Sequence, residues 1–385
     1  MRIVTHVLSL ERLGGLEVNT LEATAALVAR GHEVHVLYGA PRSGGAAPGT
    51  RAEFQAAGAI LHGPFPFSST VLAAPLRVPG FLPAARLVAR LRPDVVWLQR
   101  TEHVLWGQTV ARVAGVPLVS HVHHLVNYGR ALPYLTRGVA RFIAVSEFVR
   151  DRWVEVGIDS SRVDVVPNAV PAASYPPGGP AELEAARAAL GLPAGVPTAL
   201  YYGRMAREKG LEVALDAWEL LAPARDAAHL VLAGDFGPGD DPFRARVDRA
   251  VATGTVTALP SQRDVVPLLH AADVVLFPTL MQESFGRVAL EAIMTHRPVL
   301  ASAIGAVPEV LSGRLDRSLV PPDDPAALAE GLRSLLPWRQ EEPGLGAQCG
   351  AEAERRFSFD AYIARLETSL GAAAVARRRR SAAAG

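Results

Sequence analysis

Strand-like apolar runs alternate with helix-like runs along most of this 385-residue chain. Parallel sheets with helices on both faces have this pattern, because their buried strands are apolar throughout and each crossover needs a helix. In the first half a helix is expected over Leu16–Arg30. The strand-like runs there are Ile3–Leu8, Glu33–Tyr38, Asp94–Leu98, Pro117–Val122, Arg141–Val145 and Val163–Val166. The order predicts a doubly wound α/β sheet.

A segment rich in proline and glycine, residues 171–197, interrupts the alternation and is typical of a linker or hinge. A second series follows it, with helices expected over Leu211–Ala222 and Phe285–Met294. Its strand-like runs are Thr198–Tyr202, His229–Ala233, Thr255–Leu259, Asp273–Phe277 and Pro298–Ser302. We therefore expect two Rossmann-like domains, residues 1–170 and 198–350, facing across a cleft at the carboxyl ends of their strands, where such sheets bind ligands.

The charge balance argues against a nucleic-acid partner, because the net charge is only +1 at pH 7. The charge is unevenly spread. Residues 1–171 carry 17 Arg against 12 Asp and Glu, whereas the remainder carries 22 basic against 26 acidic residues. Two interpretations stay open: an anionic substrate or a membrane surface faces the first half, or its basic face is simply solvated.

Several features favour a cytoplasmic protein. The one cysteine, Cys349, cannot form an intrachain disulfide, which fits a reducing compartment. The N-terminal run is too short and polar for a signal peptide, and no apolar stretch approaches the ~20 residues of a membrane-spanning helix. Residues 372–385, which include four consecutive arginines, are expected to form a disordered tail. A peripheral contact with the inner face of the membrane stays open.

Lys209 is the only lysine among 39 basic residues. It follows Arg204 in the loop after an expected strand, where a basic pair suggests a phosphate site. A compact ammonium differs from a guanidinium in reach and hydration, so a retained lysine can mark a specific role. On composition alone, chance survival of one lysine explains the observation equally well.

Two further loops follow expected strands of the first half. Gly14-Gly15 would let backbone amides approach a ligand at a helix N-terminus, although a tight turn explains the pair as well. The G-x-G-x-x-G fingerprint is absent, which disfavours a nicotinamide or flavin cofactor. His121, His123 and His124 end another strand. No cysteine or carboxylate lies at ligand spacing, so a polar cluster lining a cleft is favoured over zinc. His121 could also be an ordinary core histidine.

The segment Phe277–Glu291 carries the strongest signal. Ser284 is expected to cap a helix that begins at Phe285, with Glu283 just ahead of it and Glu291 about two turns along. Seven helical residues rise roughly 10 Å, which is close to the distance from the sugar to the ribose of a nucleotide diphosphate sugar. The amides at the helix start would then meet the phosphates. Two solvated helix glutamates are the simpler alternative.

Together these segments resemble the retaining glycosyltransferases of family 4, which have the GT-B fold, over most of the chain. The matching motifs are the diglycine, Arg30-Gly31-His32-Glu33-Val34, Ala144–Val149, Val166–Val170, Gly203-Arg204-x4-Lys209-Gly210, Glu283-x7-Glu291 and Pro308-Glu309-Val310. Residues 351–371 are similar to the helix that crosses back to the first domain. Two departures occur: Ile304–Val307 replaces a segment that often holds Gly-Gly, and the glycine of Met-Ala-x-Gly-x-Pro is replaced within Met294–Pro298.

The resemblance implies a role for each matching residue. Arg204 and Lys209 would bind the donor diphosphate and stabilise the leaving nucleotide. Glu283 would bind the transferred sugar and Glu291 the ribose. His123, or alternatively His121, would face the reacting centre. The remaining donor-site positions would be Gly14, Gly15, Ser284, Phe285 and Gly286. Family members need neither a cofactor nor a bound metal, and front-face attack commonly explains their retention of anomeric configuration.

The implied function is transfer of a hexose from a UDP- or GDP-sugar to an acceptor hydroxyl. A nucleotide-sugar epimerase of the same fold and a non-catalytic nucleotide-sugar-binding subunit are the alternatives. Acceptor contacts are expected from loops of the first domain, around residues 40–80 and 100–135. A polysaccharide, a lipid-linked acceptor and a secondary-metabolite aglycone all fit the sequence.

Overall fold

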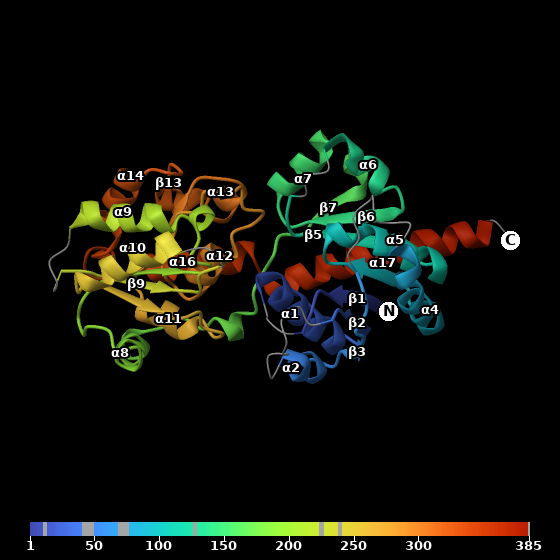
Figure 1. Cartoon of the computed structure of the whole chain (residues 1–385), viewed down its shortest axis with the longest axis horizontal. Coiled ribbons are helices and arrows are strands. Elements are labelled where there is room, and N and C mark those ends of the chain that lie inside the picture. The colour runs from blue at the N-terminus through green and yellow to red at the C-terminus, as the bar shows by residue number, and fades with distance from the viewer. Residues whose placement is uncertain are drawn as a thin grey trace. The chain divides into compact units, whose positions relative to one another are not determined.

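The computed structural model describes residues 1–10, 14–40, 50–67, 77–125, 129–222, 227–237 and 241–383, and these fall into two compact units (Figure 1). The first unit contains Met1–Asn168 and Phe359–Gly385, and the second contains Ala169–Ser358. The chain therefore passes between the units twice. Parts of the loops expected to contact the acceptor, residues 41–49, 68–76 and 126–128, lie outside the described residues.

The described residues of the first unit form a seven-stranded sheet of order β3-β2-β1-β4-β5-β6-β7, in which every pair is parallel. Its strands are β1 (Arg2–Val7), β2 (Glu33–Tyr38), β3 (Ile60–His62), β4 (Val95–Leu98), β5 (Leu118–Val122), β6 (Val139–Ala144) and β7 (Val163–Val165). Six of them were expected from the apolar runs. The three-residue strand β3 was not, because it lies at the sheet edge and is partly exposed.

Helices cover this sheet on both faces (Figure 1). They are α1 (Gly15–Ala29), α2 (Thr50–Ala56), α4 (Leu82–Leu91), α5 (Val104–Ala114), α6 (Leu132–Leu135), α7 (Glu147–Glu155) and α17 (Phe359–Ala383). The helix α17 packs against β4, β5, β6 and α1, so the chain from Phe359 onward belongs to the first unit. It is helical to Ala383, over residues that were expected from 372 onward to form a disordered tail.

The described residues of the second unit repeat the arrangement with six parallel strands in the order β10-β9-β8-β11-β12-β13. They are β8 (Thr198–Tyr202), β9 (His229–Ala233), β10 (Val256–Leu259), β11 (Val274–Phe277), β12 (Val299–Ser302) and β13 (Leu319–Val320). Only the two-residue β13 was missed. Its helices are α8 (Pro180–Ala189), α9 (Leu211–Leu221), α10 (Asp241–Ala252), α11 (Val266–Ala271), α12 (Arg287–Met294), α13 (Val307–Val310), α14 (Pro325–Leu335), α15 (Trp338–Glu341) and α16 (Leu345–Arg356).

The proline-rich segment 171–197 falls within the second unit, which begins at Ala169. Buried cations hold it in place. Arg187 donates to Asp273 Oδ2 at 2.6 Å, and Arg297, only 1% exposed, donates to the Gly178 carbonyl at 2.9 Å. Ion pairs and carbonyl contacts of this kind depend on tertiary packing, so composition could not reveal them.

Candidate functional site

The expected donor-site residues follow β8 and β11, the two strands at which the order of the second sheet reverses. Arg204 and Lys209 lie after β8, and Glu283 lies after β11. These strands are adjacent and parallel, so their carboxyl ends meet at the same edge. Ligands of open α/β sheets bind at such a switch point.

Lys209 and Glu283 form an ion pair, with 2.6 Å between Nζ and Oε1. Both side chains are partly buried, and Thr279 Oγ1 donates to the same carboxylate oxygen at 3.2 Å. The backbones of the two loops are also joined, since Leu280 N donates to the Glu208 carbonyl at 3.0 Å. Arg204 instead pairs with Glu208 and is more than half exposed. The structure thus brings Lys209 to Glu283 and leaves Arg204 at the rim.

Gly210 makes the close approach of these loops feasible. Its φ is +76°, and a Cβ there would lie 1.8 Å from the Pro278 carbonyl oxygen. Any side chain would therefore force the loops apart. Gly210 thus lets the loops that carry Lys209 and Glu283 come close enough for the ion pair to form.

Glu291 lies on α12 and is 7% exposed, within a closed network of hydrogen bonds. Its Oε1 accepts from Tyr175 at 3.0 Å and from Arg287 Nε at 2.6 Å, and its Oε2 accepts from the Tyr202 hydroxyl at 2.6 Å. Burial and the Glu291 carboxylate raise the pKa of Tyr202 well above its usual value. Sequence reasoning missed both tyrosines, because only the fold brings residues 175 and 202 to residue 291.

The helix after Glu283 begins later than predicted. Gly286 has a φ of +99° and precedes α12, which starts at Arg287, so Ser284 is not the N-cap and Phe285 does not open the helix. A residue with positive φ cannot continue a right-handed helix. The predicted rise of seven helical residues between Glu283 and Glu291 is therefore wrong. Phe285 is buried, with its ring edge-on to Phe357 at 5.6 Å.

Both departures from the family pattern include a residue with positive φ. Gly305 has a φ of +61°, and a Cβ there would lie 2.6 Å from Glu283 N, while Ala306 N donates to the Glu283 carbonyl at 2.8 Å. The segment Ile304–Val307 thus fixes the backbone of Glu283 with a single glycine. His296, within the second departure, has a φ of +62°, a conformation that glycine adopts more easily.

In the first unit, the diglycine lies at the start of α1, after β1. Gly14 is the N-cap, and its N–H donates to Glu17 Oε2 at 3.2 Å. The other oxygen of Glu17 accepts from Arg100 Nη2 at 2.8 Å. Arg100 follows β4, the neighbour of β1, so this contact spans the switch point of the first sheet. Neither Glu17 nor Arg100 carried a sequence signal.

His121 lies within β5 and His123 and His124 follow it, as their spacing predicted. His121 and His123 share one face, with ring centroids 3.9 Å apart. His121 is fully buried and, within the described part of the chain, neither of its ring nitrogens has a hydrogen-bond partner. His123 is partly exposed, and its Nε2 lies 3.0 Å from Gln99 Oε1. Burial lowers the pKa of His121 to about 3 and, together with His121, His124 and Arg100, also lowers that of His123.

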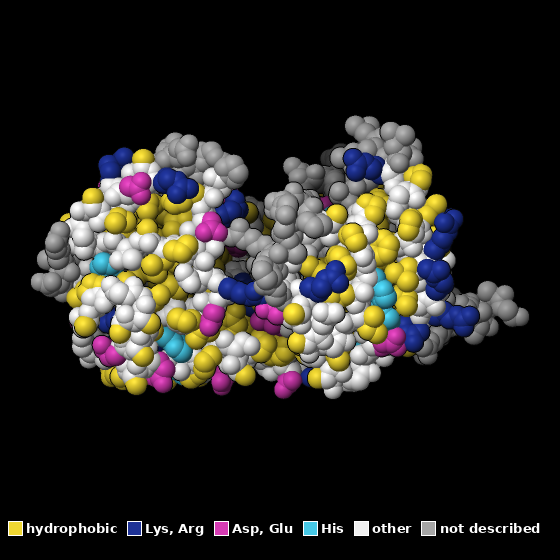
Figure 2. All heavy atoms as spheres, turned by 60° about the horizontal axis from the view of Figure 1, so that its bottom comes forward, with side chains coloured by type: hydrophobic (Ala, Val, Ile, Leu, Met, Phe, Trp, Pro, Cys, Tyr) yellow, Lys and Arg dark blue, Asp and Glu magenta, His cyan; other side chains and the backbone are white. Residues whose placement is uncertain are grey.

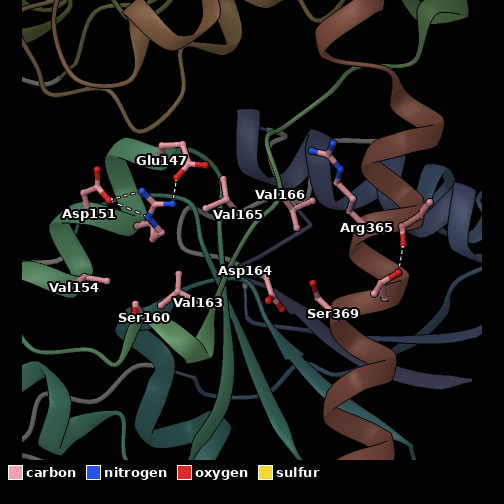
Figure 3. Close-up of a pocket in the computed structure, with 13 residues that line it drawn as sticks. Glu147, Asp151, Val154, Ser160, Val163, Asp164, Val165, Val166, Arg365 and Ser369 are labelled. Atoms are coloured by element: carbon pink, nitrogen blue, oxygen red, sulfur yellow. Dashed lines mark hydrogen bonds and ion pairs between the residues drawn. The ribbon is translucent and has the colours of Figure 1, made fainter.

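A cavity of about 850 Å³ lies elsewhere in the first unit, between α7, β7 and α17 (Figure 3). Valines 154, 163, 165 and 166 line its apolar part. Arg150 pairs there with Glu147 and Asp151, and Arg365 and Ser369 extend from α17 (Figure 3). None of the predicted site residues lines it.

Three wider expectations concern metals, membranes and charge. In the described ranges no three His, Cys, Asp or Glu side chains gather as a metal site would require. That the reaction needs no metal stays a prediction. Nor is any helix there long and apolar enough to cross a membrane. Part of the arginine excess is exposed on and just after α4, at Arg86, Arg90 and Arg92. Figure 2 shows basic side chains along the right-hand edge of the first unit.

Comparisons with known proteins agree with this arrangement. Residues 196–337 match the family model "Glycosyl transferases group 1", and residues 13–174 match "Glycosyltransferase Family 4". The D-inositol 3-phosphate glycosyltransferase of Nocardia farcinica is 30% identical over 376 residues, which cover 88% of this chain and 81% of the relative. The enzyme of the same name from Acidothermus cellulolyticus is 31% identical, over 90% of this chain and 83% of its own.

Solved structures show the same fold. Anabaena HepE in complex with UDP and glucose has a TM-score of 0.81 at 20% identity, covering 97% of this chain and all of HepE (100%). WaaG, a glycosyltransferase involved in lipopolysaccharide biosynthesis, has a TM-score of 0.68 at 17% identity, covering 95% of this chain and 98% of its own. These likenesses confirm the predicted GT-B fold of two Rossmann-like domains.

Proposed function

This chain belongs to the glycosyltransferases of group 1 and family 4, and we propose that it moves a hexose from a nucleotide diphosphate sugar to an acceptor hydroxyl. We further propose that the donor is a UDP- or GDP-sugar, that anomeric configuration is retained and that no bound metal is needed. UDP and glucose in the HepE complex support a nucleotide-sugar donor.

The ion pair of Lys209 with Glu283 is the observation that carries this proposal. A cation for the diphosphate and a carboxylate for sugar hydroxyls lie 2.6 Å apart, at a sheet edge that favours ligands. Glu283 would orient the sugar, and Lys209, with Arg204 at the rim, would bind the diphosphate. Glu291, held by two tyrosines and an arginine, would accept from the ribose hydroxyls.

The reaction breaks the bond between the anomeric carbon and the diphosphate oxygen and forms one to the acceptor oxygen. Negative charge builds on the departing diphosphate, and Lys209 and Arg204 would stabilise it there. In a front-face attack the acceptor proton passes to the departing oxygen, so the nucleotide diphosphate leaves with it. His123, in the first unit, would contact the reacting sugar or the acceptor.

Product analysis tests this proposal. The protein is incubated with UDP- or GDP-sugars and a panel of acceptors, with chelator present, and proton NMR reads the anomeric configuration of the product. D-inositol 3-phosphate belongs in the panel because two relatives carry its name, beside lipid-linked and polysaccharide acceptors. Retention with chelator present is expected. Inversion would refute the proposed retention of configuration. Turnover restored only by a divalent metal would refute the proposed independence of metal. Epimerised donor without acceptor would favour the epimerase.

A further inference from the structure

A chain of buried polar groups connects β1 to His123. The Thr5 hydroxyl lies 2.9 Å from the Trp97 carbonyl oxygen, Gln99 Nε2 lies 3.1 Å from Thr5 Oγ1, and Gln99 Oε1 lies 3.0 Å from His123 Nε2. Thr5 and Gln99 are both 0% exposed. Solvent therefore does not reach the polar groups of Thr5 and Gln99, whose donors and acceptors must be matched by these partners.

The positions of the protons follow from the first contact. A carbonyl oxygen can only accept, so the single hydroxyl proton of Thr5 lies toward Trp97. Thr5 Oγ1 must then accept from the Gln99 side chain, which orients the amide with its NH2 group toward Thr5. The amide oxygen consequently faces His123, and an oxygen there requires a donor at Nε2. The opposite amide orientation would leave two acceptors in contact at one of the three positions.

We propose that Thr5 and Gln99 are positioning residues that hold His123 as the tautomer with its proton on Nε2. Nδ1 is then the accepting nitrogen of the neutral ring. With its one ring N–H directed to Gln99, neutral His123 has no second N–H to donate to a sugar or an acceptor. Any effect of this tautomer on transfer rests on the proposed function, whereas the tautomer itself does not.

The surroundings of the ring favour its neutral form. His121 packs against it with 3.9 Å between centroids, His124 and Arg100 lie near it, and burial adds to the cost of charging it. His124 is itself paired with Glu102 at 3.0 Å. All of these effects except that of Glu102 disfavour a second proton on His123. A neutral ring has two tautomers, and the Thr5–Gln99 chain selects one.

NMR of protein labelled with ¹⁵N-histidine reads the tautomer directly, since protonated and unprotonated ring nitrogens have well-separated shifts. The His123 signals are assigned by their loss in His123→Asn. In the wild type at pH 7 we expect a proton on Nε2 and none on Nδ1. A proton on Nδ1 alone, or on both nitrogens, would overturn the proposal.

Two substitutions at Thr5 separate the hydrogen bond from packing. Thr5→Val keeps the shape and removes the hydroxyl, so His123 should become a mixture of tautomers and kcat should fall about tenfold with the donor KM unchanged. Thr5→Ser keeps the hydroxyl and removes a methyl group, so it should match the wild type. Equal tautomer populations in the two variants would contradict the proposal. Gln99→Met, which removes both amide groups, replaces Thr5→Val if that variant does not fold.

The two readouts also separate this inference from the proposed function. If the tautomer is as expected and Thr5→Val changes it, but no donor and acceptor pair reacts, the positioning chain stands and the proposed function fails. If transfer occurs but His123 carries its proton on Nδ1, the proposed function stands and the positioning chain fails.

Discussion

The ammonium of Lys209 lies 2.6 Å from the carboxylate of Glu283, although 73 residues separate them in the chain. The pair joins the loops after β8 and β11, and Gly210 permits the close approach. The only lysine of the sequence is therefore placed against the carboxylate that the resemblance assigns to the sugar. The single lysine of the composition therefore lies in the proposed donor site.

We expect Lys209→Ala to lower kcat by about 10²–10³, as for loss of one preorganised group that stabilises developing charge. The free energy of unfolding should fall by about 1–3 kcal/mol, because the largely buried Glu283 carboxylate loses its cation and keeps Thr279 as a donor. Steady-state kinetics and urea unfolding measure the two effects. Arg207→Ala is the matched control, because Arg207 is a neighbouring cation that is 75% exposed. If both variants were equally active, Lys209 would have no special role.

Lys209→Arg tests why lysine was retained. A planar guanidinium keeps the charge but needs more room beside Glu283 and Thr279 than an ammonium does. We expect activity between those of the wild type and Lys209→Ala, with correct folding by circular dichroism. Full activity would mean that any cation suffices, and the uniqueness of the lysine would then be an accident of composition.

Gly210→Ala should destabilise the second unit by more than about 2 kcal/mol, because strain at positive φ adds to a clash with Pro278. Gly191→Ala is its control. Gly191 also has positive φ, +66°, but a Cβ there would meet nothing within 4 Å, so only the strain of about 1 kcal/mol applies. Urea unfolding of both variants gives the difference. Equal costs would show that the loop moves freely aside.

Glu291→Gln tests the assignment of Glu291 to the ribose. Removing the side chain with Glu291→Ala would take the carboxylate away from Tyr202 and Arg287 in a largely buried place, at about 3 kcal/mol, so the isosteric change is the cleaner one. We expect the wild type to bind UDP more tightly than 2′-deoxy-UDP and the variant to lose most of this preference. Calorimetric titration measures both. An unchanged preference would remove Glu291 from the ribose site.

His121 predicts acid sensitivity. Burial lowers its pKa to about 3 in the folded protein. Between about pH 3 and pH 6.5 the unfolded chain therefore binds a proton at this residue that the folded chain does not. The free energy of unfolding should therefore fall as pH drops below about 6.5, with a slope near 1.4 kcal/mol per pH unit from this residue. His121→Phe should reduce the slope by that amount between pH 6 and 5. Parallel curves for variant and wild type would contradict the account.

Sequence reasoning reached the sheets because buried parallel strands leave continuous apolar runs, as at Thr198–Tyr202, predicted to the residue. It missed β3 and β13, which are too short or too exposed to leave one. The start of α12 was misjudged because Ser284 looked like a cap, while the backbone of Gly286 decided the boundary.

Contacts within the site were harder to predict from the sequence than the strands were. The spacing of Glu283 and Glu291 indicated both carboxylates as site residues. It did not indicate that Glu283 pairs with Lys209, or that Glu291 accepts from Tyr175 and Tyr202. Such partners come from strands and loops far apart in the chain. Gln99 is the clearest case, since nothing around residue 99 in the sequence points to His123.

Donor binding tests the central claim most directly. Thermal unfolding of the wild type and Lys209→Ala is followed with a panel of UDP- and GDP-sugars. A ligand at 100 times its Kd stabilises the folded state by about 2.7 kcal/mol. The account predicts that at least one nucleotide sugar raises the Tm of the wild type, and that Lys209→Ala loses most of this shift. No shift with any nucleotide sugar, or the same shift in both proteins, would contradict it.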